Sequence, residues 1–175
     1  MENFRSAGSP EHDASAELFH EVSGAPRSSV GDATRTLLDN AESMVGKSLL
    51  NQPRDSQYRG SDVPPNLGCA ATVSNLLMMS NPEFTGRDFQ INVDKLESTL
   101  RRNLEAYRLS DSANPQPGDI VIGRDGRGGG RHVGILGPVE NGQQMVFNNS
   151  GGQLAKEPLA KAFERYKTIY YLRVP

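Results

Sequence analysis

The chain has 175 residues, a formal net charge of -2 at pH 7 and one cysteine. This length fits one domain with a short extension, which can bury a substantial core although a lone cysteine forms no internal disulfide. The near-neutral charge argues against a protein that coats nucleic acid or an anionic membrane, and no run reaches the roughly 18 apolar residues that a membrane span needs.

The first 30 residues differ in composition from the rest of the chain. They are rich in Ser, Ala, Gly, Pro and charge and poor in large apolar side chains, so we expect a disordered tail at 1–30 and a folded domain at 31–175. The first residues contain no apolar stretch of the kind found in Sec-type signal peptides. We therefore expect synthesis in the cytoplasm. His12 and His20 lie there without clustered Cys or carboxylates, which favours solvated side chains over a metal site.

Helical spacing dominates the first half of the domain. Apolar residues recur with that spacing over 37–45, between Asp32, a good N-cap residue, and Gly46, which is typical of a C′ position. Residues 51–68 are rich in Pro and Gly and predict a loop, and loops of this length usually carry function or are mobile. The spacing predicts two further helices, at 69–80 and 93–107.

The second half of the chain changes to strand patterns. Turn residues at 114–119 and a glycine-rich loop at 123–130 separate short apolar runs. The glycine-rich loop lacks the Lys-Ser/Thr ending of a phosphate-binding loop, so we reject that interpretation. Helices followed by a meander of strands indicate an α+β fold with an antiparallel sheet. We expect strands at 120–122, 132–136, 144–148 and 168–174, a turn at 137–142 and a short helix from 158 to about 165.

Cys69 is predicted to lie in the first turn of the second helix. Unpaired N–H groups and the positive end of the helix dipole favour an anion there, and they lower the pKa of a thiol, especially beside a histidine. This is the setting of a cysteine nucleophile, and it predicts a partly exposed thiol with a low pKa. The alternative is a small buried apolar residue, the commonest fate of a lone free cysteine.

His132 opens a predicted strand directly after the glycine-rich loop and is the only histidine of the predicted domain. A thiol nucleophile needs such a base within hydrogen-bond reach and a third group that orients the base. Asn148 on the next strand is the first choice, because its amide oxygen can accept from the imidazole N–H. Gln144 shares its strand face and stays an alternative, whereas Asn149 would point to the other face or act as a turn residue.

Four short segments form one ordered set: Gly-Cys at 68–69, Pro-Gly-Asp-Ile-Val at 117–121, Arg-His-Val-Gly-Ile at 131–135 and Val-Phe-Asn-Asn-Ser at 146–150. In order and spacing they resemble the core of the NlpC/P60 and CHAP cysteine hydrolases. The resemblance covers roughly residues 32–175 and implies a papain-like fold that cleaves amide bonds in peptidoglycan, as an endopeptidase or amidase. It implies Cys69 as nucleophile, His132 as base and Asn148 as the third residue. It also makes Tyr58 a candidate substrate-binding residue, because many members place an active-site tyrosine in this loop.

The chain departs from the NlpC/P60 pattern around its cysteine. Gly-Cys-Ala-Ala at 68–71 stands where Asp-Cys-Ser-Gly is usual, which points to a CHAP-like or divergent branch and leaves the substrate open. Peptidoglycan lies outside the cytoplasm, so phage lysis or a specialised secretion system would have to deliver the protein.

The sequence therefore predicts a monomeric hydrolase that binds peptidoglycan or a peptide and needs no cofactor or metal, since no Cys/His cluster has zinc spacing. Two alternatives stay open. One is an inert binding or structural module on the same fold, and the other is a cysteine protease or effector that acts on proteins.

Overall fold

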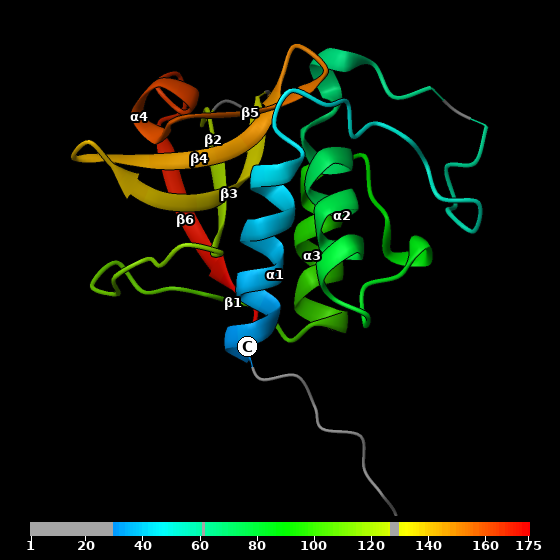
Figure 1. Cartoon of the computed structure of the whole chain (residues 1–175), viewed down its shortest axis with the longest axis horizontal. Helices are drawn as coiled ribbons and strands as arrows, with labels where there is room; N and C mark the ends of the chain where they lie inside the picture. The colour runs from blue at the N-terminus through cyan, green and yellow to red at the C-terminus, as the bar shows by residue number, and fades with distance from the viewer. Residues whose placement is uncertain (1–29, 61, 127–129) are drawn as a thin grey trace, which may run out of the picture.

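The computed structural model describes residues 30–60, 62–126 and 130–175, so the disorder expected at 1–30 lies outside the described residues except at its last position. Over these residues, helices pack on a six-stranded antiparallel sheet with the strand order β1-β6-β2-β3-β4-β5 (Figure 1). This confirms the α+β class and the antiparallel sheet. The elements are α1 (Val30–Ser43), α2 (Cys69–Ser80), α3 (Val93–Asn103), β1 (Tyr107–Arg108), β2 (Ile120–Arg124), β3 (Arg131–Glu140), β4 (Gln143–Ser150), β5 (Gln153–Pro158), α4 (Leu159–Ala162) and β6 (Thr168–Arg173), with short 3-10 turns η1 (Pro65–Leu67) and η2 (Gly86–Asp88).

The helices differ in extent from the sequence-based expectation. Helix α1 begins at Val30, so Asp32 lies in its first turn and is not the N-cap. Helix α3 ends at Asn103 and not at 107, because Glu105 adopts a positive φ of 53° and residues 107–108 then pair with β6. The short helix α4 covers only one turn after Pro158.

Two strands also differ from the expectation. Strand β3 continues through the predicted turn at 137–142 as far as Glu140, with an irregularity in its pairing to β4 between Leu136 and Val139. Strand β5 was not predicted, because it pairs at the sheet edge and Leu154 is its only buried residue, so its sequence shows no alternation. Main-chain hydrogen bonds between Leu154 and residues 46–47 attach the end of α1 to this edge.

Helix α2 is buried on nearly all sides, although its spacing predicted one buried face. It packs against α1, α3, β3 and β4, and Figure 1 shows it among the grouped helices beside the sheet. Small side chains such as Ala70 and Ala71 let these neighbours approach closely, and both have no exposed area. Ser74 exchanges hydrogen bonds of 3.1 and 3.2 Å with the main chain of Gln90. Packing against four other elements restricts movement of the helix N-terminus, which is where Cys69 lies.

The sheet is buried on both faces. Its larger core lies between the helices and side chains such as Val133, Ile135 and Phe147. The alternate residues of the strands point to a second, smaller cluster that α4 and the turn after it cover. That cluster consists of Val121, Val146, Phe163 and Tyr166, with Leu159, Ala162 and Tyr171 packed against it.

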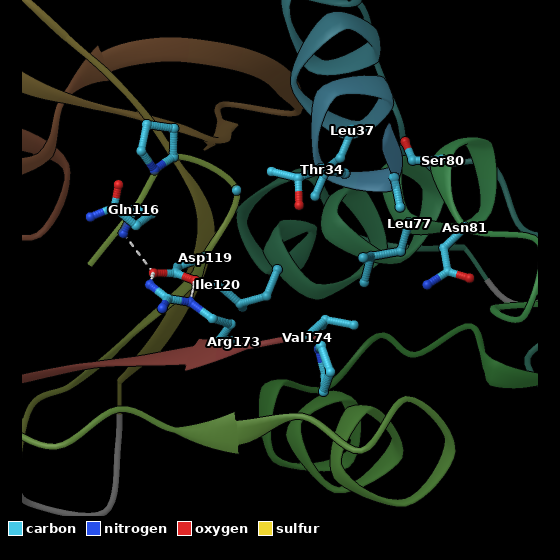
Figure 2. Close-up of a pocket in the computed structure, with 14 residues that line it drawn as sticks. Thr34, Leu37, Leu77, Ser80, Asn81, Gln116, Asp119, Ile120, Arg173 and Val174 are labelled. Carbon is cyan, nitrogen blue, oxygen red and sulfur yellow. Dashed lines mark hydrogen bonds and ion pairs between the residues drawn. The ribbon is translucent and has the colours of Figure 1, made fainter. Parts of the chain in front are cut away.

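The Pro-Gly-Asp turn before β2 is closed by a buried carboxylate. Gly118 adopts a φ of +97°, a conformation that favours glycine. Asp119, which is 4% exposed, accepts a hydrogen bond of 2.7 Å from the main-chain N–H of Gln116 and bonds of 2.8 and 2.9 Å from Arg173. Figure 2 shows these contacts beside a hollow of about 190 Å³ between α1, the end of α2 and this turn. The carboxylate therefore joins the start of β2 to the end of β6.

We expect Asp119→Ala to lower the free energy of unfolding by roughly 2 kcal/mol or more, because it leaves a main-chain donor and a half-buried guanidinium without their acceptor. Urea denaturation followed by circular dichroism measures this loss. Asp111→Ala is the matched control, since Asp111 is exposed in a turn, and it should change stability by less than about 0.5 kcal/mol. Equal small losses in the two variants would contradict the role given to Asp119.

Candidate active site

Cys69 begins α2, as the sequence predicted, but its side chain is only 9% exposed. The residue before it is a glycine that packs closely against its neighbours. A Cβ atom at Gly68 would collide with the side chain of Leu50 and lie 3.3 Å from Oδ1 of Asn149. Asn149 in turn donates a hydrogen bond of 2.7 Å to the main-chain oxygen of Pro65, in η1. The loop that leads to Cys69 is therefore packed directly against the end of β4.

Burial raises the pKa of the Cys69 thiol above its ordinary value. The main-chain groups of Val133, Ala70 and Cys69 itself act in the opposite direction through hydrogen bonds, and so does the positive charge of Arg165. The thiol is therefore buried and not partly exposed as the sequence predicted, and burial acts against the low pKa that was expected of it. The helix N-terminus does supply donors to the sulfur, but the loss of solvation outweighs them.

The imidazole of His132 lies against aromatic rings of the smaller cluster. Its plane is 4° from that of Tyr166, with ring centroids 5.7 Å apart, and the Phe163 ring is 5.0 Å away. Burial lowers the pKa of His132 below its ordinary value of 6.5, so the ring is neutral at pH 7. A neutral imidazole held in one orientation is ready to accept a proton.

Asn148 is the amide that contacts His132. Its Oδ1 lies 3.0 Å from His132 Nε2, and the residue is 2% exposed. Gln144 cannot take this place, because its side chain donates a hydrogen bond of 2.6 Å to the main-chain oxygen of Gly137. Of the two amides, Asn148 and not Gln144 is therefore the one that contacts the imidazole.

Cys69, His132 and Asn148 line one hollow of about 310 Å³. A second hollow of about 430 Å³ lies beside it. Both are lined by Asn66, Cys69, His132 and Arg165, so these side chains stand where the two hollows meet. An extended ligand that fills both hollows would cross the thiol and the imidazole.

Arg165 places a fixed positive charge beside these groups. Its Nη2 donates a hydrogen bond of 2.8 Å to the Tyr166 hydroxyl, and the centre of its guanidinium lies 5.0 Å from the centroid of that ring. Its charge lowers the pKa values of both Cys69 and His132. It therefore favours a thiolate and disfavours an imidazolium at the same site.

Tyr58 does not line either hollow that contains Cys69. Its hydroxyl donates a hydrogen bond of 2.9 Å to the side chain of Gln90, and its ring packs edge-on against Phe89. The structure therefore does not bring this candidate substrate-binding residue to the site.

Sequence reasoning missed Asn66, Glu157, Arg165 and Tyr166, which also line the first hollow. Asn66 had a usable signal, since it lies three positions before the cysteine in a loop that leads to it. The other residues come from β5 and from the turn after α4. Their place at the site depends on strand pairing that the sequence pattern did not reveal.

In the described part of the chain, no group of His, Cys, Asp and Glu side chains is arranged to hold a metal ion. No described helix has the length and apolar character needed to cross a membrane. Comparison of the chain with protein-family models and with curated proteins gives no match. The case for a function therefore rests on the geometry of the site and on the sequence motifs.

Alkylation of Cys69 by iodoacetamide should follow a pH profile with its inflection above about 8.5, the ordinary thiol value, because burial raises the thiol pKa. Arg165→Gln should move the inflection to still higher pH, since it removes a cation that stabilises the thiolate. Arg87→Gln, at an exposed arginine in η2, should leave the profile unchanged. A wild-type inflection below 8.5 would show that the helix N-terminal donors outweigh burial.

Proposed function

We propose that the chain is a cysteine hydrolase with a papain-like fold that cleaves amide bonds in peptidoglycan peptides, as an endopeptidase or amidase. The observation that carries the proposal is that Cys69, His132 and Asn148 line one hollow, with the amide oxygen of Asn148 bonded to the imidazole. The motifs that resemble NlpC/P60 and CHAP hydrolases support cell-wall peptides as the substrate.

His132 acts as the proton carrier in this mechanism. Its Nε2 is engaged by Asn148, which leaves Nδ1 for the thiol. The Cys69 sulfur attacks the carbonyl carbon of the scissile amide while its proton passes to Nδ1. The tetrahedral intermediate then collapses, the leaving amine takes that proton, and an acyl-thioester remains. His132 next removes a proton from water, which attacks the thioester, releases the acid and restores the thiol.

The oxyanion of the intermediate needs donors at the start of α2. The first-turn N–H groups of that helix, including that of Cys69, have no partner within the helix and point at the sulfur and its surroundings. Asn66 also lines both hollows and carries a side-chain amide that can donate a hydrogen bond. We therefore assign the oxyanion to the main-chain N–H of Cys69 with the Asn66 side chain as the second donor.

The proton states of the free site indicate how the thiol is activated. The thiol pKa is raised and the imidazole pKa is lowered, so both groups are neutral at pH 7. These directions favour a thiol that passes its proton to His132 as it attacks the carbonyl carbon. Arg165 favours the developing negative charge at the sulfur during this step.

Hollows lie on both sides of the thiol and could each take part of a substrate. The hollows of about 310 and 430 Å³ meet at Cys69 and His132, so a peptide that fills both places its scissile bond over the sulfur. Both hollows contain charged side chains, among them Glu157 and Lys161 in the first and Asp94 and Arg131 in the second. In each hollow these opposite charges form an ion pair with each other. A substrate that carries both amines and carboxylates, as peptidoglycan stems do, would exchange partners with them.

We expect His132→Ala to lower the release of muropeptides from purified peptidoglycan by about 10²–10⁴-fold, the range of a general acid–base contribution. Asn148→Ala should cost less, because Asn148 only orients the imidazole, and the double variant should be little worse than His132→Ala, because such residues act as a unit. Gln144→Ala is the matched control and should retain nearly full activity. Zymography and mass spectrometry of the released fragments make the measurement.

Near-wild-type activity in His132→Ala would overturn the mechanism. Cleavage of a protein substrate by the wild type, without muropeptide release, would favour the protease alternative. Binding of peptidoglycan without turnover of either substrate would favour the inert module.

A further inference from the structure

We propose that Glu157 is a positioning residue that fixes the amide orientation of Asn148 and thereby selects which nitrogen of His132 carries the proton. The catalytic consequence rests on the function proposed above. The structural part, the tautomer of His132, does not depend on any substrate.

Glu157 lies on β5, one strand beyond Asn148. It pairs directly with Val146, so its side chain lies diagonally across from Asn148 on the same face of the sheet. Its Oε1 is 3.1 Å from Nδ2 of Asn148, and its Oε2 is 3.2 Å from Nζ of Lys161. The Glu157 side chain is 17% exposed, so this contact is largely shielded from solvent.

The chemistry of the carboxylate determines the orientation of the amide. An ionised carboxylate can only accept hydrogen bonds, so the NH₂ group of Asn148 must face Glu157. The amide oxygen must then face His132, and an amide oxygen also can only accept. His132 Nε2 is therefore the protonated nitrogen, and in a neutral ring Nδ1 is left bare.

The opposite amide orientation would disable the base. It would turn the Asn148 NH₂ group toward Nε2, which would have to give up its proton to accept the bond. The ring proton would then lie on Nδ1, the nitrogen that must accept the proton of Cys69. Glu157 prevents this state although it touches neither the thiol nor the imidazole.

Other charged and titratable groups face His132, but none fixes the tautomer. Cys69 faces it from α2, and Tyr166 and Arg165 face it from the turn after α4. The charge of Arg165 lowers the pKa of His132, and the charge of Glu157 raises it. Lys161 forms an ion pair of 3.2 Å with Glu157, and Glu157 also accepts the hydrogen bond from Asn148.

The test compares Glu157→Gln with Glu164→Gln. The first variant keeps the shape of the side chain but can both donate and accept, so it no longer dictates the orientation of Asn148. The second makes the same change of charge at an exposed residue that lines the same hollow. Nuclear magnetic resonance of the full chain with ¹⁵N-labelled histidine identifies the tautomers, and comparison with His132→Gln assigns the signal against His12 and His20.

We expect wild type and Glu164→Gln to show His132 protonated at Nε2 alone, and Glu157→Gln to show a signal for both tautomers. The His132 pKa should fall in Glu157→Gln, because a carboxylate that raises it is gone. The kcat/KM for peptidoglycan fragments should fall by about tenfold, equivalent to roughly 1.4 kcal/mol or one hydrogen bond to a charged group.

A wild-type ring protonated at Nδ1 would overturn the inference, and so would a Glu157→Gln variant with an unchanged tautomer. Equal changes in the tautomer signals of the two variants would also overturn it, since they would show a general effect of charge. If the wild type releases no product from peptidoglycan, the proposed function fails, while the spectra still decide the role of Glu157.

Discussion

The packing of α2 against four other elements is the constraint on which the site depends. A helix with one buried face can slide or rotate against its partner, but α2 meets α1, α3, β3 and β4 at once. Its small residues let those elements approach closely. The loop before its first turn is attached to β4 by the hydrogen bond from Asn149 to the main-chain oxygen of Pro65. The thiol therefore has a fixed position relative to β3, which supplies both the His132 side chain and the main-chain group of Val133. Rigid backbone elements and not loop closure determine the geometry of these groups.

The neighbouring groups of the site follow from the antiparallel register of three strands. Asn148 lies opposite Gly134, where a Cβ would lie 2.8 Å from the Phe147 oxygen and 3.3 Å from the Asn148 Cβ. The glycine thus leaves room for the amide beside the strand that carries His132. The next strand, β5, adds Glu157 on the same face. His132, Asn148 and Glu157 therefore form a row of polar side chains across β3, β4 and β5. Each is hydrogen-bonded to the next.

Local patterns explain why part of this arrangement could be predicted from the sequence. The helical spacing around Cys69, the strand that begins near His132 and the face shared by Gln144 and Asn148 are all short-range features. The choice between the two amides needed the structure, because it depends on a hydrogen bond between Gln144 and the main chain of Gly137. Burial of α2 and the raised thiol pKa are tertiary effects that no local pattern carries. Strand β5 was also not predicted from the sequence. It is defined by its pairing with β4, and its residues do not alternate between apolar and polar.

The buried state of the single thiol also affects how the protein withstands oxidation. Peroxides attack the thiolate, so a thiol whose pKa is raised by burial is converted slowly to sulfenic acid. The chain contains no second cysteine that could trap sulfenic acid as an internal disulfide, and further oxidation to sulfinic acid is largely irreversible. The burial that raises the thiol pKa therefore also limits the amount of thiolate that peroxides could oxidise.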